Sequence, residues 1–257
     1  MPASDLSLLI DAAHASGAIA RRYWKNSPDV WDKQDGAGPV TEADLEIDRM
    51  LSAELRGARP DYGWLSEETE DDAQRLSHEK VFIIDPIDGT RAFIAGERNF
   101  SHSLAIAENG RITTAAVFLP MLDKLYVATS GSHALLNDTP ITVSSVAIEK
   151  ANLLAAKPNF EPQHWPGGVP PVKRHFRSSL AYRLCLVAEG AFDGMLTLRD
   201  TWEWDVAAGS LIAAQAGATV SDTHGGKPAY NNARPMLKGM IAAGPDLHSG
   251  LRARLPD

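Results

Sequence analysis

The chain has 257 residues, of which 44% are hydrophobic and 23% are charged, and these ordinary globular values exclude a chain that is mainly disordered. Its 25 Lys and Arg stand against 33 Asp and Glu, and the net charge of −8 has the wrong sign for neutralising a nucleic acid polymer. No stretch approaches the roughly 20 apolar residues of a membrane span, and the N-terminus lacks the basic start of a signal peptide. The single cysteine, Cys185, suits a reducing compartment. We therefore predict a cytoplasmic protein whose partners include neither a membrane nor a nucleic acid polymer.

The first half of the chain alternates helices with strands. Apolar residues at helical spacing predict a helix over residues 4–24, and a glycine-containing loop follows over 32–41. Thr41 and Asp44 have the spacing of a capping box, which predicts a second helix from this point to about Leu55. Strands are expected over 79–85, 100–120 and 123–130, the middle one being a hairpin that turns at Asn109-Gly110.

The second half again alternates strands and helices, without an internal repeat, which predicts an α+β fold built in layers. We place the boundary near 145–150. Residues 1–147 then form an α+β half, and residues 148–257 form an α/β half. The expected elements of the second half are strands over 151–157, 192–198 and 238–244, helices over 178–191 and 204–218, and a Pro-rich excursion over 158–173.

Residues 81–96, VFIIDPIDGTRAFIAG, place two aspartates at the end of an apolar run. The run predicts a buried strand, and Pro86 must end its ladder because proline has no N–H to donate. A self-bonded turn would explain one Asp-Gly pair, but not two acids, Asp85 and Asp88, directly after a buried strand. Gly89 allows a positive φ, and Thr90 then begins a turn or helix that has free N–H groups.

One known class of enzymes has a similar pattern. Haloacid-dehalogenase-type phosphatases also place two aspartates after a strand, but two residues apart, and the first of them attacks phosphorus. In this chain Asp85 and Asp88 are three residues apart, with Pro86 between them. That spacing lets both carboxylates and the carbonyl of Ile87 converge on cations. We therefore reject the dehalogenase interpretation.

Other acids have simple interpretations when each is taken alone. Glu67 and Glu68 follow an apolar stretch, and adjacent glutamates are usually solvated surface. Asp205 is at the start of an expected helix, where an aspartate is commonly an N-cap. Asp44 is likewise explained as a capping residue.

The combination of these segments is specific. PVTEADLEIDRML, WLSEE, DPIDGTRAF and WDVAAGSLIAAQAG, in this order, resemble the inositol monophosphatase family of Mg²⁺-dependent, lithium-sensitive phosphatases. The resemblance covers nearly the whole chain. It implies an α/β/α/β/α layered sandwich, two halves that flank one active site, and a homodimer. It also implies two or three Mg²⁺ ions per site and in-line attack of a metal-activated water on the phosphate of a small metabolite, without a phospho-enzyme.

The resemblance also assigns metal ligands residue by residue. Glu67 matches the shared glutamate ligand of the family. Asp85, the carbonyl of Ile87 and Asp88 match the ligands of its aspartate motif, and Asp205 matches the late aspartate that holds the second metal. The physical chemistry agrees, because converging carboxylates cannot all ionise without cations between them. Oxygen-only ligands favour Mg²⁺ over Zn²⁺.

Phosphate and water contacts are implied in the same way. The backbone N–H groups of Gly89 and Thr90, beside Asp88, match positions that bind the phosphate. Thr90 and Asp44 match the pair that orients and deprotonates the attacking water, and we count Glu67 with them as catalytic. Lys33 matches a lysine of the mobile loop that closes over the metals. Glu68, by contrast, receives no direct role.

The substrate is less strongly specified. Inositol phosphatases have a glutamate seven residues before the late aspartate, where this chain has Leu198, so a hydroxyl acceptor is missing. Arg199 and Asp200 are alternative lining groups. A basic residue at the position of Arg91 is typical of the branch that hydrolyses 3′(2′),5′-bisphosphate nucleotides such as 3′-phosphoadenosine 5′-phosphate, and also of the histidinol phosphatase branch. The segments SSLAYRLCLVAEG and EWDVAAG resemble the bisphosphate nucleotidases, although the first segment is two residues longer than that branch's form. We therefore rank the bisphosphate nucleotide first. Inositol-1-phosphate, histidinol phosphate and a non-catalytic metal- or phosphate-binding regulator follow as alternatives.

Overall fold

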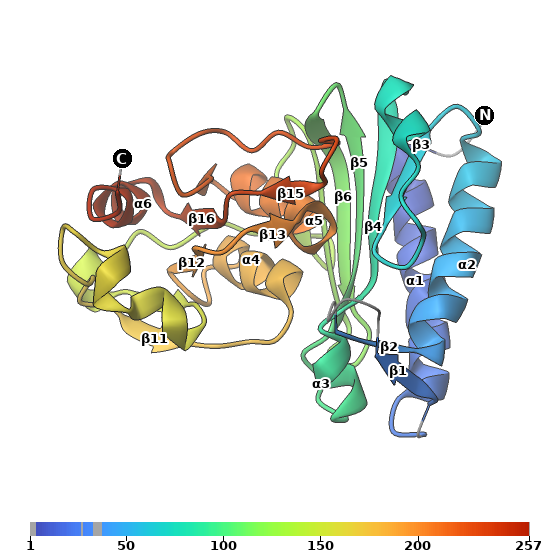
Figure 1. Ribbon diagram of the computed structural model, residues 1–257, viewed down its shortest axis with the longest axis horizontal. Coiled ribbons are helices and arrows are strands. Elements are labelled where there is room, and N and C mark those ends of the chain that lie inside the picture. Colours follow the sequence, from blue (N-terminus) through green and yellow to red (C-terminus); the bar gives the residue numbers. More distant parts are fainter. Residues whose placement is uncertain (1–3, 27, 33–37, 257) are drawn as a thin grey trace.

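The computed structural model describes residues 4–26, 28–32 and 38–256. Its main strands form a seven-stranded sheet, in the order β3-β4-β5-β6-β7-β8-β9, and a five-stranded sheet, in the order β11-β10-β12-β16-β14. Figure 1 shows α1 and α2 on one side of the first sheet, α4 and α5 between the sheets, and α6 beyond the second. The layers therefore run α/β/α/β/α, which confirms the predicted α+β sandwich.

The first helical layer consists of α1 (Asp5–Tyr23) and α2 (Glu42–Ala58). Ser4 caps α1 by accepting from the backbone N–H of Ser7, and Thr41 caps α2 with the predicted capping box. Both helices are amphipathic: their apolar face packs on the first sheet, and their polar face is exposed to solvent. The residues buried at this interface include Leu9, Ala13, Ile47, Leu51, Leu55, Phe82, Ile84, Leu104 and Phe118.

The seven-stranded sheet contains β4, the strand that ends in Asp85 and Asp88. Strand β4 pairs in parallel with β3 and antiparallel with β5, and the later strands follow as antiparallel neighbours. Asn109 and Gly110 both have positive φ, as the predicted hairpin turn between β5 and β6 requires. The strands are β3 (Gly63–Ser66), β4 (Lys80–Asp88), β5 (Ser101–Glu108), β6 (Arg111–Leu119), β7 (Lys124–Thr129), β8 (Leu135–Leu136) and β9 (Thr139–Pro140).

The central layer consists of α4 (Leu180–Ala188) and α5 (Glu203–Gln215). Every residue of α4 is buried, which is expected for a helix between two sheets. Side chains of both helices join side chains of both sheets in one apolar cluster. The two halves of the chain therefore share a core, and the boundary at 147/148 stays a prediction.

The remaining elements complete the second sheet and its outer cover. The predicted strand over 238–244 is β16, and the Pro-rich excursion contains short 3₁₀ turns before β11. None of the helices in the described ranges is long and apolar enough to cross a membrane. The bounds are β10 (Asn152–Leu154), β11 (Lys173–His175), β12 (Gly194–Thr197), β14 (Thr219–Ser221), β16 (Met240–Ala243), α6 (Pro245–Arg252), β1 (Val30–Asp32), β2 (Pro39–Thr41), β13 (Thr201–Trp202), β15 (Met236–Leu237) and α3 (Thr90–Ile94).

Candidate active site

A bulge at the end of β4 turns the two motif aspartates to the same face of the sheet. Asp85 lies opposite Ser103 and Asp88 lies opposite Ser101, so three steps along β4 match two steps along β5. Side chains alternate along a regular strand, and positions three apart would otherwise point to opposite faces. The extra residue of the bulge interrupts that alternation, so two aspartates three residues apart can point to the same face.

A buried histidine holds the bulge. His102 is fully buried and its Nδ1 donates to the carbonyl of Pro86, 2.5 Å away. A carbonyl only accepts, so the proton is on Nδ1, and among the described residues Nε2 has no hydrogen-bond partner. Burial lowers the pKa of His102 to about 4, which keeps the ring neutral.

Gly89 makes the turn from β4 into α3. It has φ 96°, the left-handed conformation that the sequence predicted, and it is the N-cap of α3. A Cβ at this position would lie 3.3 Å from the carbonyl oxygen of Asn99 and 3.5 Å from the Cα of Phe100. Thr90 then starts α3 beside the aspartates.

Three carboxylates from three elements converge. Glu67 follows β3, Asp85 is on β4, and Asp205 is in the first turn of α5, and each offers an oxygen within 4.8 Å of the others. Oδ1 of Asp85 is buried and has no hydrogen-bond partner among the described residues. Burial, together with the neighbouring carboxylates, raises the pKa of Asp85 and of Asp205 well above the ordinary value. Such a cluster requires cations or protons.

Asp88, at the end of β4, contacts the N-terminus of α4, a helix of the second half of the chain. Its Oδ2 accepts from Ser179 Oγ at 2.6 Å and from the N–H of Ala181 at 2.7 Å, and its Oδ1 accepts from the N–H of Leu180 at 3.2 Å. Burial raises the pKa of Asp88 to about 6, and these hydrogen bonds act against that rise. Asp88 therefore fastens α4 to the end of β4.

Asp44 and Thr90 are in contact, as the resemblance implies. Thr90 Oγ1 is 3.4 Å from Asp44 Oδ1 and 3.1 Å from the carbonyl oxygen of Ile87. Asp44 is fully buried, and its Oδ2 accepts from the N–H of Thr41 at 2.9 Å. The capping interpretation of Asp44 is thus correct, and its other oxygen still faces the motif.

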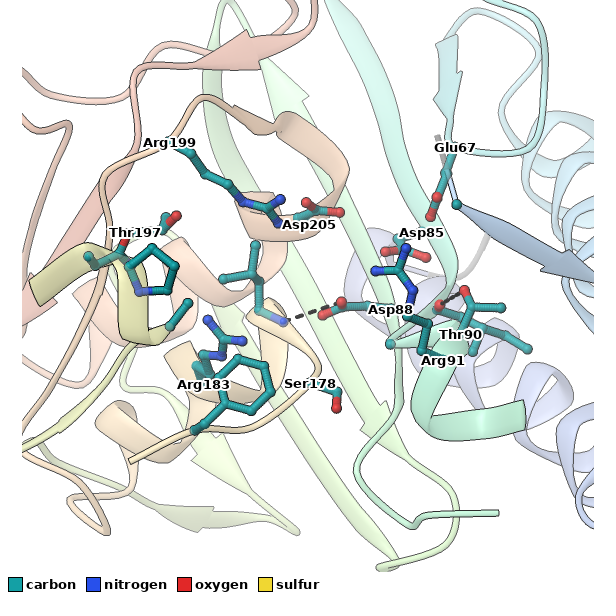
Figure 2. A pocket seen from close by; sticks show the side chains of 18 of the residues that line it. Glu67, Asp85, Asp88, Thr90, Arg91, Ser178, Arg183, Thr197, Arg199 and Asp205 are labelled. Atoms are coloured by element: carbon teal, nitrogen blue, oxygen red, sulfur yellow. Dashed lines mark hydrogen bonds between the residues drawn. The ribbon is translucent and has the colours of Figure 1, made fainter. Parts of the chain in front are cut away.

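A cavity of about 680 Å³, with residues of both halves of the chain in its lining, contains four of these acids: Glu67, Asp85, Asp88 and Asp205. Figure 2 shows Glu67, Asp85 and Thr90 on one side of this cavity and Arg183, Thr197 and Arg199 on the other. Leu198 and Arg199 also line it, whereas Glu68 is absent from its lining, and the substrate contacts of Leu198 and Arg199 stay a prediction. Lys33 lies outside the described residues.

The donor set fits Mg²⁺. The available ligands are carboxylate oxygens and one backbone carbonyl, which are hard donors, and Asp85 Oδ1 is a buried oxygen still lacking a partner. No His or Cys belongs to the cluster of possible ligands found among the described residues. Glu67, Asp85 and Asp205 form this cluster, Asp88 lines the same cavity outside the cluster, and Asp44 reaches the site through its contact with Thr90.

Sequence reasoning missed two features of the site. Ser179 could be recognised only as an N-cap before an apolar helix, since nothing local shows that Asp88 shares this helix end. Arg183 is inside a helical apolar pattern, and its position facing the cavity follows from the packing of α4 between the sheets. The signal available for Arg183 was a charge within a buried helix.

The layered fold and the carboxylate-lined cavity are those expected of a metal-dependent phosphatase. The model of the inositol monophosphatase family matches residues 2–255, and the chain belongs to this family of phosphatases. It is 33% identical to an inositol-1-monophosphatase of Rhizobium meliloti (strain 1021), over 93% of this chain and 91% of that protein. It is 31% identical to the Nus factor SuhB of Vibrio cholerae, over 86% of each chain.

The chain is also similar to a relative that is named for another activity and to a solved structure. A histidinol-phosphatase of Chlorobaculum parvum is 30% identical, over 93% of this chain and 96% of that protein. The structure of an IMPase from Thermotoga maritima superposes with a TM-score of 0.82 at 30% identity, covering 96% of this chain and 95% of the other. These names give no support to the bisphosphate nucleotide that we ranked first.

Proposed function

We propose that the protein hydrolyses a phosphomonoester of a small metabolite with the help of two or three Mg²⁺ ions. The observation that carries this proposal is the buried, unpartnered Oδ1 of Asp85 within the cluster it forms with Glu67 and Asp205. Buried carboxylates at this separation favour bound cations. Asp88 and the carbonyl of Ile87, which line the same cavity, complete the proposed ligand set.

The proposed cations and the residues of the protein have different roles in the reaction. When bound, Mg²⁺ would neutralise phosphate charge, make a water more acidic and stabilise the leaving oxygen. The N–H groups of Gly89 and Thr90 are proposed to donate to the phosphate. The Thr90 hydroxyl, with its two acceptors, is proposed to orient the attacking water, and Asp44 to accept its proton. The role of Lys33, which lies outside the described residues, remains a proposal drawn from the resemblance.

For the leading substrate we retain the bisphosphate nucleotide. Leu198 lines the cavity where the inositol phosphatases have a hydroxyl-binding glutamate, and an apolar side chain cannot accept from a polyol. Inositol-1-phosphate is the second candidate, because the Rhizobium relative is named for that activity. Histidinol phosphate follows, because the Chlorobaculum relative is named for it. A homodimer, lithium sensitivity and a cytoplasmic location remain proposals drawn from the resemblance and the composition.

The test is phosphate release from 3′-phosphoadenosine 5′-phosphate, inositol-1-phosphate, histidinol phosphate and fructose 1,6-bisphosphate, each with Mg²⁺ and with excess chelator. Glu67→Gln removes a proposed ligand, and Glu68→Gln makes the same change at the neighbouring residue, which does not line the cavity. We expect Glu67→Gln to lose activity by several orders of magnitude and Glu68→Gln to stay near wild type. Activity of Glu67→Gln near that of the wild type would remove Glu67 from the site.

A further inference from the structure

Arg183 is a buried cation whose charged end faces the active-site cavity. It lies on α4, its surface is 5% exposed, and it lines the cavity with the acids. Its Nε donates to the carbonyl of Arg177 at 2.6 Å, and its guanidinium lies 4.5 Å from the ring centre of Phe176. These two contacts fix the plane of the guanidinium.

The terminal nitrogens of Arg183 differ from those of the other buried arginine, Arg75. Arg75 is 2% exposed, and its guanidinium donates to Asp71, to Asn231 and to the carbonyl of Asn232. Within residues 4–26, 28–32 and 38–256, by contrast, Arg183 has no hydrogen bond from either terminal nitrogen and no carboxylate within salt-bridge distance. Neither terminal nitrogen is among the fully buried unpartnered atoms of the described residues, so both open onto the cavity, where they are suited to an anion from outside the chain.

A second arginine faces the same part of the cavity. Arg199 follows β12, lines the cavity, and enters it on the same side as Arg183, across from Asp85 and Thr90 (Figure 2). Burial lowers the pKa of Arg183 to about 10, and the charge of Arg199 adds to that lowering, whereas Asp88 and Asp205 act against it. Two like charges converging on a cavity are stabilised by an anion between them.

We propose that Arg183, together with Arg199, binds a second anionic group on the leaving-group side of the substrate, and that it selects phosphomonoesters that carry a second phosphate. The scissile phosphate would lie beside Asp85 and Thr90, and the second phosphate on the opposite wall. A guanidinium suits this role because its planar fork donates two parallel hydrogen bonds to phosphate oxygens. This inference rests on the proposed function and adds a specificity-determining residue to it.

Pairs of substrates that differ only in the second phosphate test the proposal. We choose 3′-phosphoadenosine 5′-phosphate against adenosine 3′-phosphate, and fructose 1,6-bisphosphate against fructose 1-phosphate, which separates a nucleotide source from a sugar source. We expect the wild type to prefer the bisphosphate in one pair by about 30-fold in kcat/KM, the effect of one desolvated charge pair. Arg183→Gln should remove that preference, because it should lower kcat/KM for the bisphosphate far more than for the monophosphate.

Two further variants and one control sharpen the result. Arg183→Lys keeps the charge but not the fork and should retain part of the preference, and Arg199→Gln, at an exposed site, should reduce it without risk to folding. Lys227→Gln makes the same charge change at an exposed position away from the cavity lining and should change nothing.

The outcomes separate the inference from the proposed function. Wild-type hydrolysis of both members of each pair at similar rates would overturn the inference and support the phosphatase. The same holds if Arg183→Gln slows both members equally, because Arg183 would then only balance the acids at Asp88 and Asp205. Absence of Mg²⁺-dependent phosphate release from these four compounds and also from inositol-1-phosphate and histidinol phosphate would overturn the proposed function, and the inference with it.

Discussion

Replacing Asp85 with asparagine should stabilise the metal-free protein while abolishing its activity. Asp85 is 1% exposed, and its carboxylate has an oxygen within 4.8 Å of oxygens of Glu67 and Asp205. Because its Oδ1 has no hydrogen-bond partner among the described residues, the substitution breaks no bond at that atom. The new amide can donate to the carboxylates that the aspartate repelled.

The expected gain in stability follows from the distance between the carboxylate oxygens. At an effective dielectric constant of about 20, two unit charges 4.8 Å apart repel by roughly 3.5 kcal/mol. Protonation limits this cost, because burial and the neighbouring carboxylates raise the pKa of Asp85 well above its ordinary value. We therefore expect Asp85→Asn to raise the free energy of unfolding by about 2 to 3 kcal/mol, which corresponds to a Tm increase of about 4 to 12 °C.

Thermal unfolding near neutral pH, in chelator and in saturating Mg²⁺, measures the stability of the metal-free protein and its response to the metal. Wild-type Tm should rise with Mg²⁺, because binding to the folded state alone stabilises it, and Asp85→Asn should respond little. Asp200→Asn, which removes a surface carboxylate paired with Lys238 at 2.9 Å, should keep the wild-type response. A lower Tm for Asp85→Asn than for wild type in chelator would refute the repulsion argument.

Three other perturbations test neighbouring parts of the site. Chelation should abolish phosphate release, Mg²⁺ should restore it, and millimolar lithium should inhibit it; undiminished activity in chelator would contradict the mechanism. Leu198→Glu should shift the kcat/KM ratio toward inositol-1-phosphate by roughly tenfold, or about 1.4 kcal/mol, with metal affinity unchanged. A wild type that already prefers inositol-1-phosphate would reverse our ranking of substrates. His102 has its pKa lowered to about 4, so the unfolded chain binds more protons between pH 6.5 and 4, and acid should cost the fold about 3 kcal/mol through this residue. His102→Asn should show a shallower fall of Tm over that window, and an unchanged slope would be evidence against a buried neutral ring.

Local sequence was sufficient for the features that depend on neighbours along the chain. The capping box of Thr41 and Asp44, the positive φ of Gly89 and the turn at Asn109-Gly110 each depend on a few adjacent residues, and the structure shows all of them. The layered fold was also predictable, because the alternation of helices and strands limits how apolar faces can be covered.

Features that depend on contacts between distant segments were not predictable from pattern alone. The spacing of Asp85 and Asp88 places them on one face only because the bulge opposite His102 shifts the register against β5. Asp205 joins them from α5, and its assignment came from a family resemblance. The cavity-facing position of Arg183 depends on how α4 packs between two sheets.

The serine opposite Asp88 is part of the joint between the two halves. Ser101 lies opposite Asp88 across the β4–β5 pair, and its hydroxyl is 3.0 Å from that of Ser179, the N-cap of α4. Ser179 also donates to Asp88 at 2.6 Å. The first half therefore positions α4 through a proposed metal ligand and through that ligand's partner on the neighbouring strand.

The serine opposite Asp85 does the same for α5. Ser103 donates to the carbonyl of Trp204 at 3.0 Å, and Trp204 immediately precedes Asp205. Each aspartate of the bulge thus has a cross-strand serine that bonds to the start of a central-layer helix. Since Asp205 reaches Glu67 and Asp85 only if α5 is correctly placed, these bonds link the packing of the two halves to the geometry of the proposed cation site. A cation bound there would in turn hold the halves together, because its ligands come from both.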